Sequence, residues 1–211
     1  MNYFNINVKK KELEIILQNV PTFNNPNPNL EQYLTPANIA ADILFIAHQF
    51  QDITNKKIVD LGCGTGIFSI GAKIIGAKKV IGVDIDKNCI EIAKKYSKEN
   101  KYKIQFLNID ISEFNKKCDT ILMNPPFGAQ KRNINIDRNF INKALENSYI
   151  IYSLHLSKTI SFIKKLIELK KGEITYSKKY KFPIKWIFDF HKKKVVEYDV
   201  TMIRIKVNNK L

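Results

Sequence analysis

The chain has 211 residues and a formal net charge of +15 at pH 7, and 45% of its residues are hydrophobic. This length and apolar content suit one globular domain with a sizeable core and argue against a disordered chain. No apolar run reaches the ~18 residues that a membrane-spanning helix needs. Three widely spaced cysteines without a Cys-x-x-Cys pair exclude a disulfide framework and a cysteine-built zinc site, so we expect a cytosolic protein without a bound metal.

The N-terminal residues predict a helix and a linker ahead of the main domain. Apolar residues at helical spacing between Lys10 and Val20 indicate a short amphipathic helix. Segment 24–29 is rich in Asn and Pro, and its prolines lack a backbone donor and restrict the residue before them, which is typical of an irregular linker. We therefore expect residues 1–29 to form a helix and linker, and residues 30–211 to form the main domain.

Beyond the linker, helical stretches alternate with short apolar strands. Thr35 followed by Pro36 predicts a helix start, with Thr35 as the N-cap and proline at the first helical position. Asp86 is the expected N-cap of a later helix. The expected strands are 57–61, 79–83, 103–107, 120–123, 149–154, 173–180 and 195–207, and the expected helices after the linker are 36–50, 68–75, 86–99, 137–148 and 157–170.

This order of elements predicts the fold class. Parallel strands need crossover connections, so a strand–helix alternation indicates a parallel sheet that is covered by helices on both faces. The last two long strands, 173–180 and 195–207, have no helix predicted between them and add an antiparallel strand. We expect an α/β fold with a doubly wound, Rossmann-like sheet that is mostly parallel and has an antiparallel last strand.

A glycine-rich loop joins the first strand of this sheet to the following helix. Its spacing, Gly62-Cys63-Gly64-Thr65-Gly66, differs from the dinucleotide fingerprint and lacks the Gly-Lys-Ser/Thr of a P-loop. Such glycines permit a tight turn and let a ligand approach the backbone amides closely. A tight strand–helix turn would explain the glycines equally well, so the residues around the loop have to decide between the two interpretations.

Three acidic residues sharpen the interpretation of the loop. Asp60, Asp84 and Asp110 end or follow three successive predicted strands, at the sheet edge where ligands bind in such folds. Asp84 can accept both ribose hydroxyls of an adenosine, and Asp110 can accept the adenine amino hydrogens while Ile111 donates its backbone N–H. This arrangement is typical of class I methyltransferases and predicts S-adenosylmethionine as the cofactor.

The tetrapeptide Asn124-Pro125-Pro126-Phe127 follows the fourth predicted strand. Its prolines fix an extended backbone. The side-chain oxygen of Asn124 and the main-chain carbonyl of Pro125 can accept the two hydrogens of a planar NH₂ group, while Phe127 offers a face for stacking. Catalysis then consists of positioning, without a prior general base. The pattern favours methylation of a planar nitrogen and leaves adenine, guanine and glutamine open as substrates.

Family-specific segments occur beside these shared motifs. They are Leu30-Glu31-Gln32-Tyr33 with Thr35, Tyr152-Ser153-Leu154-His155 and Phe190-His191-Lys192-Lys193-Lys194. With the glycine loop, Val83-Asp84-Ile85-Asp86 and the tetrapeptide, the chain resembles the methyltransferase-like protein 5 family, over about residues 30 to 207. These proteins are adenine-N6 methyltransferases of small-subunit ribosomal RNA, and the chain is similar to the archaeal members in particular.

The resemblance implies roles for further residues. Gln32 and Thr35 would reach over the methionine end of the cofactor, and Gly62, Gly64, Thr65 and Ile67 would line the loop, with Thr65 acting through its backbone. A flipped adenine would stack on Phe127, because chemistry on a base edge requires extrusion of the base. Eukaryotic relatives use a small zinc-binding activator subunit on the sheet edge. That edge would be Lys103–Leu107 here, with Ile104 and Phe106 as contacts.

The positive charge is concentrated near the C-terminus, since residues 156–211 hold 15 Lys and Arg against five Asp and Glu. Lysine clusters neutralise phosphates, so this excess predicts an RNA partner, although a solvated charged loop would have the same composition. His155 lacks a fixed partner in the sequence, and we expect a structural role for it. The candidates for a phosphate platform are Lys178, Lys179, Lys181, Lys185, His191, Lys192, Lys193 and Lys194.

Four functions therefore remain in competition. The first is adenine-N6 methylation of small-subunit rRNA, and the second is guanine-N2 methylation of RNA. Glutamine-N5 methylation of a protein is third, disfavoured by Phe127 and by the short N-terminal part. A non-catalytic RNA-binding assembly factor is fourth, disfavoured by the intact tetrapeptide.

Overall fold

The structure is a computed structural model that describes residues 8–23, 30–127, 136–185 and 195–208. The strands are β1 (Lys57–Leu61), β2 (Lys79–Asp84), β3 (Gln105–Asn108), β4 (Cys118–Met123), β5 (Ser148–Leu156), β6 (Gly172–Lys185) and β7 (Val195–Val207). The helices are α1 (Lys10–Gln18), α2 (Ala37–Gln49), α3 (Ile67–Ile74), α4 (Lys87–Glu99), α5 (Ile136–Asn147) and α6 (Ile160–Leu169), with short 3₁₀ turns η2 (Ile111–Glu113) and η4 (Ser157–Thr159).

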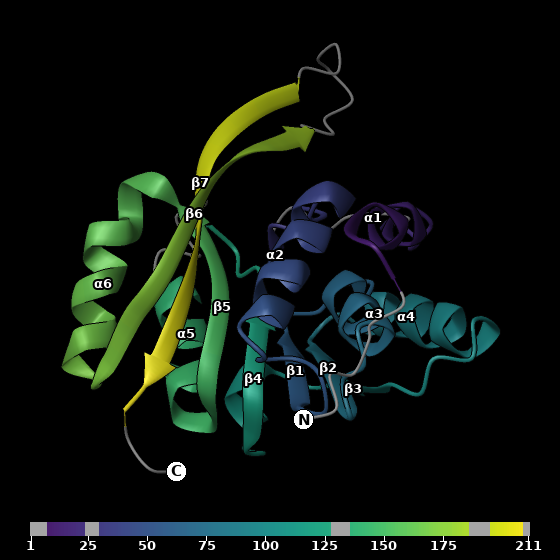
Figure 1. The fold of residues 1–211 in the computed structure, drawn as a ribbon, viewed down its shortest axis with the longest axis horizontal. Helices are drawn as coiled ribbons and strands as arrows, with labels where there is room; N and C mark the ends of the chain where they lie inside the picture. The colour runs from purple at the N-terminus through teal and green to yellow at the C-terminus, as the bar shows by residue number, and fades with distance from the viewer. Residues whose placement is uncertain (1–7, 24–29, 128–135, 186–194, 209–211) are drawn as a thin grey trace.

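The strands form one seven-stranded sheet in the order β3-β2-β1-β4-β5-β7-β6 (Figure 1). Strands β1 to β5 pair in parallel, whereas β7 is antiparallel to both β5 and β6. The predicted doubly wound sheet with an antiparallel last strand is therefore confirmed. The strand order reverses between β1 and β4, which is where ligands bind in such sheets.

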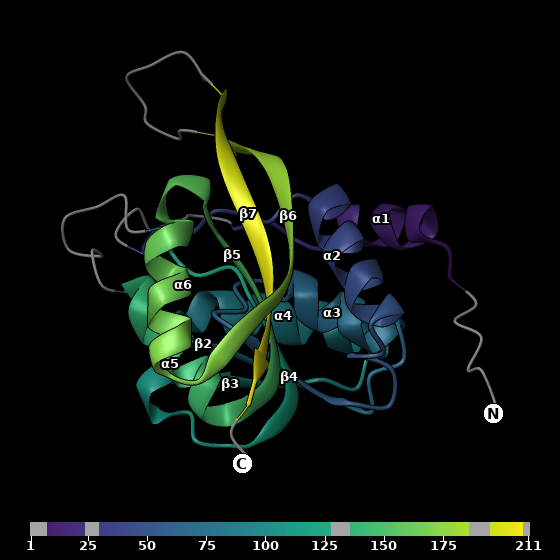
Figure 2. The same cartoon turned by 60° about the vertical axis from the view of Figure 1, so that its left-hand side comes forward.

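Helices cover both faces of the sheet (Figures 1 and 2). Helices α1 to α4 lie on one face, and α5 and α6 lie on the other. The N-terminal helix shares the core of the first face, because Leu13 and Leu17 are buried with Ile43 and Leu44 of α2. Along the part of the chain that the structure describes, no helix is both long and apolar enough to cross a membrane.

One predicted helix cap is wrong. Helix α2 begins at Ala37 with Pro36 at the N-cap position, and no side chain caps it. The hydroxyl of Thr35 instead accepts a hydrogen bond from Asn124. The predicted cap of α4 is confirmed, because Asp86 accepts hydrogen bonds from the backbone amides of Asn88 and Cys89.

The last two strands extend beyond the rest of the sheet. Strand β5 ends at Leu156, opposite Val200 of β7, but the pairing of β6 with β7 continues to Lys185 and Val195. Figure 1 shows this hairpin projecting past the carboxyl ends of the central strands. The outer hairpin therefore stands beside the edge where the cofactor loop and the tetrapeptide lie. The predicted absence of a helix between the two strands concerns residues 186–194, which lie outside the described residues.

A buried ion pair holds this half of the sheet to the other elements. Arg204 of β7 donates to the Asp52 carboxylate from Nε at 2.8 Å and from Nη2 at 3.2 Å. Tyr152 of β5 donates its hydroxyl to the same carboxylate at 2.6 Å. The Tyr152-Ser153-Leu154-His155 segment therefore has a structural role. As expected, His155 is structural too: it is 2% exposed and contacts Ser153 Oγ at 2.7 Å, and burial lowers its pKa to about 3.

Strand β3 lies at the edge of the sheet, as the sequence predicted, and within the described residues it pairs with β2 alone. The expectation that Phe106 offers a contact for a partner is wrong. Its side chain is 5% exposed and packs against Ile90 and Ala93 of α4, so it belongs to the core. Ile104 precedes the strand and is half-buried.

Candidate active site

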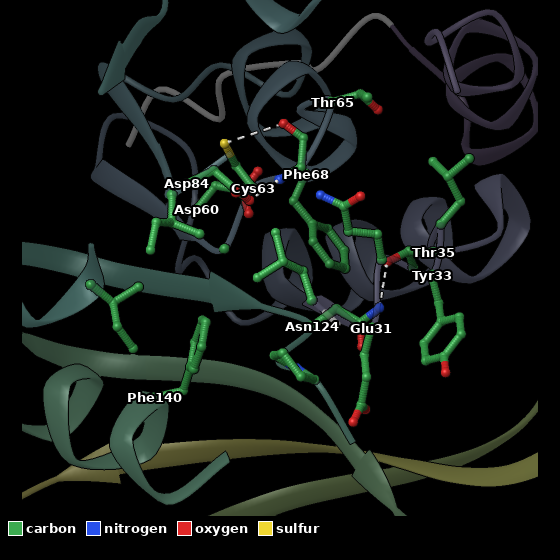
Figure 3. Close-up of a pocket in the computed structure, with 18 of the residues that line it drawn as sticks. Glu31, Tyr33, Thr35, Asp60, Cys63, Thr65, Phe68, Asp84, Asn124 and Phe140 are labelled. Carbon is green, nitrogen blue, oxygen red and sulfur yellow. Dashed lines mark hydrogen bonds between the residues drawn. The ribbon is translucent and has the colours of Figure 1, made fainter. Parts of the chain in front are cut away.

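A pocket of about 240 Å³ lies at the carboxyl ends of the central strands (Figure 3). It is bounded by the segment before α2, the glycine loop after β1, the ends of β2 and β3, the start of the tetrapeptide and helix α5. Among the residues that line it are all ten predicted cofactor residues: Gln32, Thr35, Asp60, Gly62, Gly64, Thr65, Ile67, Asp84, Asp110 and Ile111. Asn124 and Pro126 of the tetrapeptide also line it.

The glycine loop needs its glycines for conformational reasons. Gly62, Gly64 and Gly66 have positive φ angles of 74°, 52° and 94°, which other residues rarely adopt. A Cβ atom on Gly62 would also lie only 2.8 Å from Cε1 of Phe140. The backbone amide of Gly62 donates to the carbonyl of Val83 at 2.8 Å, which fixes the loop against β2. The loop therefore presents bare backbone to the pocket.

Asp84 is held by backbone amides on both oxygens. Gly64 donates to Oδ2 at 2.7 Å, and Asp86 donates to Oδ1 at 2.9 Å. Burial raises the pKa of this carboxyl above its ordinary value, although the amide hydrogen bonds act in the opposite direction. Each oxygen keeps a further lone pair, so the carboxylate can accept two more hydrogens from a ligand with vicinal hydroxyls.

Asp60 lies deeper and supports the loop from below. It is 1% exposed and accepts hydrogen bonds from the backbone amide and the hydroxyl of Ser69, at 2.8 and 2.7 Å. Burial raises its pKa to about 7, against the effect of these two hydrogen bonds. Because Ser69 belongs to α3, Asp60 ties the end of β1 to the helix that follows the loop.

The remaining predicted cofactor residues differ in how they are held. Asp110 caps the turn η2 by accepting from the backbone amide of Ser112 at 2.8 Å, and hydrogen bonding to Ser112 lowers its pKa. Gln32 donates to Asp86 Oδ2 at 2.6 Å, so its amide lies at the β2 end of the pocket. Thr65 is buried, and its hydroxyl has no hydrogen-bond partner within the described residues.

The Asn124 side chain is oriented by a residue from a distant part of the chain. Its Nδ2 donates to Thr35 Oγ1 at 3.0 Å, as the dashed line in Figure 3 shows. The other amide atom, Oδ1, is buried and lacks a hydrogen-bond partner among the residues that the structure describes. A buried acceptor without a donor is costly, so this oxygen is prepared to accept a hydrogen from a ligand.

Phe127 and Pro125 lie outside the pocket lining. Pro125 is buried, whereas Phe127 is half-buried within a group of aromatic rings. The Phe127 ring packs edge-to-face on Phe182 of β6, with centroids 5.7 Å apart, and lies nearly parallel to Tyr33 with centroids 6.4 Å apart. The tetrapeptide is therefore fixed by contacts with both the N-terminal part and the outer hairpin.

Several pocket residues were not predicted from the sequence as cofactor residues. Ile85 follows Asp84, lines the pocket and is 54% exposed. Glu31 and Tyr33 belong to the family-specific segment 30–33, so the sequence contained a signal that could have found them. Phe23 and Phe140 come from distant segments, and no motif in the sequence pointed to them. The further unpredicted residues are Leu30, Leu34, Phe68, Ile136 and Asn139, with Cys63 of the glycine loop itself.

The predicted phosphate platform is only partly available. Lys178 forms an ion pair with Asp42 at 2.6 Å, and Lys181 forms one with Asp199 at 2.8 Å. Both cations are therefore already neutralised in part by the protein. Lys179 is exposed. The other predicted residues, His191 and Lys192, Lys193 and Lys194, lie outside the described residues, as does the side chain of Lys185.

Comparisons with known proteins show that the chain is similar to methyltransferases. Residues 38–148 match the family described as methyltransferase small domain. The chain is 42% identical to the uncharacterized protein MJ0284 of Methanocaldococcus jannaschii, over 94% of each chain. It is 38% identical to the rRNA N6-adenosine-methyltransferase METTL5 of Danio rerio, over 93% of this chain and 98% of the relative. The crystal structure of PH1948 from Pyrococcus horikoshii is similar with a TM-score of 0.88 at 40% identity, over 95% of this chain and 98% of that chain.

Proposed function

The chain is a METTL5-like member of the methyltransferase small domain family, a class I methyltransferase that uses S-adenosylmethionine, and on that premise we propose that it methylates the exocyclic N6 of an adenine in small-subunit ribosomal RNA. The substrate part of this proposal is supported by the extent of the similarity to METTL5, which covers nearly the whole of both chains. The buried acceptor of Asn124, in the tetrapeptide, supports methylation of a planar nitrogen but does not choose the base.

The pocket residues fit S-adenosylmethionine. Two of them, Thr65 and Asn124, carry buried oxygen atoms without a partner in the described residues, and the positive-φ glycines leave backbone bare. When bound, this cofactor supplies an electrophilic methyl group on a sulfonium. We assign its ribose to Asp84 and its adenine to Asp110, Ile111 and the exposed Ile85. The remaining predicted cofactor residues, Gln32, Thr35, Asp60, Gly62, Gly64, Thr65 and Ile67, would hold the methionine part and the loop.

The orientation of the Asn124 amide is the observation that carries the proposed chemistry. Thr35 takes the Nδ2 hydrogen, so Oδ1 is left as an acceptor for an N–H of the substrate amine. With the Pro125 carbonyl as a second acceptor, the amine nitrogen can become pyramidal, so that its lone pair is withdrawn from the ring and localised on nitrogen. The nitrogen would then bond to the methyl carbon as the sulfonium carbon–sulfur bond breaks, leaving a neutral thioether. The proton leaves a cationic amine afterwards, to water, so the site needs no strong base. This is catalysis by preorganised polar groups.

Two partners belong to the same proposal. Small-subunit rRNA is the substrate, with the C-terminal lysines as phosphate contacts. A small zinc-binding activator subunit remains a proposal from the resemblance alone. Strand β3 is a sheet edge that could receive such a subunit, with half-buried Ile104 as the remaining candidate contact.

Nucleoside mass spectrometry on small-subunit rRNA, incubated with the protein and isotopically labelled S-adenosylmethionine, tests the proposal. We expect label in N6-methyladenosine, and we expect Asn124→Ala to lower the rate by about 100-fold or more while the protein still binds cofactor and RNA. The matched control is Asn100→Ala, at the exposed end of α4, which should leave the rate unchanged.

Other outcomes would redirect the proposal. Label in N2-methylguanosine would keep the enzyme and change the base to guanine. Label in protein glutamine would move the substrate out of RNA. A biological effect that survives Asn124→Ala would favour the assembly factor over the enzyme.

A further inference from the structure

Tyr33 lies at the substrate side of the pocket, and the mechanism above gives it no role. It lines the pocket and is half-buried. It stands two residues before Thr35, whose hydroxyl orients Asn124. Figure 3 shows its ring on the same side of the pocket as Asn124 and Glu31. Tyr33 therefore lies on the side of the pocket where Asn124 Oδ1 would accept a hydrogen of the substrate amine.

The ring of Tyr33 forms a pair with the ring of Phe127. Their centroids are 6.4 Å apart and their planes differ by only 21°. Stacked bases in nucleic acids lie about 3.4 Å apart, so one base between two rings needs about 6.8 Å. The centroid distance of 6.4 Å is the largest separation that the two ring planes can have, so the rings must move apart to admit a base between them.

The Phe127 ring is held in place by another part of the protein, and Tyr33 stands close in the chain to a fixed contact. Phe182 of β6 is fully buried and packs nearly perpendicular to Phe127, at 83°. Tyr33 is followed by the fixed contact of Thr35 with Asn124. Burial, with further contributions from Glu31 and Tyr198, raises the pKa of the Tyr33 phenol, so the ring remains neutral at physiological pH. The pair therefore offers neutral aromatic faces to an uncharged planar group.

We propose that Tyr33 is the second aromatic wall of the target-base site, so that the flipped base is held between Tyr33 and Phe127 with its exocyclic amine at Asn124 Oδ1. This inference rests on the proposed function and deepens it by assigning a further substrate-binding residue. Two facing rings suit a nucleobase, since stacking on aromatic side chains stabilises every base. The amide of a glutamine side chain is much smaller and would leave most of both rings uncovered.

Steady-state methylation of small-subunit rRNA by Tyr33→Leu and Tyr33→Phe tests this proposal. We expect Tyr33→Leu to lower kcat/KM for RNA by about 5-fold to 100-fold, the usual effect of losing one aromatic stacking partner. Affinity for S-adenosylmethionine and the thermal midpoint should stay close to wild type. Tyr33→Phe keeps the ring and should retain most of the activity. Tyr149→Leu is the matched control, because Tyr149 is half-exposed and lies at the amino end of β5, whereas the pocket lies at the carboxyl ends of the strands.

Three results would overturn the proposal. Tyr33→Leu could retain kcat/KM within twofold of wild type, which would exclude a stacking role. Tyr33→Phe could lose as much as Tyr33→Leu, which would assign the effect to the hydroxyl. A loss of cofactor affinity equal to the loss of activity in Tyr33→Leu, repeated in Tyr33→Trp, would make the residue part of the cofactor site. Failure of wild-type protein to methylate RNA would instead contradict the proposed function itself.

Discussion

The two halves of the sheet hold their carboxylates in different ways. Around β1 and β2, the partners are backbone amides and a hydroxyl from the same stretch of alternating strands and helices: Asp84 accepts from the amides of Gly64 and Asp86, and Asp60 accepts from Ser69. Around β5, β7 and β6, the partners are cations from distant segments. Asp42 contacts Lys10 and Lys178, and Asp52 contacts Arg204.

This difference has opposite effects on acidity. Burial raises the pKa of Asp60 and of Asp84, and the hydrogen bonds that each accepts do not outweigh it. Burial also acts on Asp42, but hydrogen bonds from Lys178, Lys10 and Tyr180 outweigh it and lower its pKa to about 2. The carboxylates around β1 and β2 therefore remain available as acceptors for a ligand, at a cost in stability. The carboxylates that contact β6 and β7 instead form ion pairs that stabilise the fold.

The largest expected effect concerns Asp60. Its pKa rises from an ordinary 3.8 to about 7 on folding, so the native state binds a proton more tightly than the unfolded chain. The stability that this proton contributes is present below pH 4 and is lost as the pH rises to about 7. Three pH units at 1.36 kcal/mol each correspond to about 4 kcal/mol. We therefore expect the stability of Asp60→Asn relative to wild type to rise by a few kcal/mol between pH 4 and pH 8.

Urea unfolding of the cofactor-free protein at several pH values measures this effect. The difference between Asp60→Asn and wild type is the informative quantity, because His155, with its pKa lowered to about 3, makes both proteins less stable as the pH falls. If the difference in the free energy of unfolding between the two proteins did not change with pH, Asp60 would have the same pKa in the folded and the unfolded state.

The same contrast explains which parts of the site the sequence could predict. The glycine loop, the Asp86 cap and the acids at the strand ends follow from the order of strands, turns and helices between β1 and η2, and the structure brings them together as expected. The role of Thr35 depends on Asn124, 89 residues away, so a local cap signal predicted the wrong partner. Lys178 and Asp42 are 136 residues apart, and a charge count could not show that they neutralise each other.

A smaller effect is expected for the basic residues. Lys192, Lys193 and Lys194 remain our predicted phosphate contacts, whereas the cation of Lys181 is paired with Asp199. Replacing all three with Ala should weaken RNA binding by about 10-fold at moderate salt and lower the slope of log affinity against log salt by about 2. Lys181→Ala is the matched control and should change that slope far less. Equal binding by wild type and the triple variant across a salt series would remove the proposed platform.

The smallest effect concerns Asp42, where the pH dependence has the opposite sign to that of Asp60. Because its pKa is about 2 in the folded protein, its contribution is present above pH 4 and is lost as the pH falls toward 2. Lys10 and Lys178 are partly exposed, so screening limits this contribution to about 1 kcal/mol. Asp42→Asn should therefore be less stable than wild type at pH 6, and the difference should shrink as the pH is lowered to 3.

Asp199 provides the comparison for that experiment, because its ion pair with Lys181 joins two side chains that are each 68% exposed. Asp199→Asn should leave the unfolding midpoint nearly unchanged at pH 6, since water competes for both charges. If Asp199→Asn destabilised the protein as much as Asp42→Asn, burial would not be what makes the Asp42 contacts effective. Exposed ion pairs would then stabilise the outer hairpin. Because Phe127 packs against Phe182 of that hairpin, the position of Phe127 would depend on ionic strength.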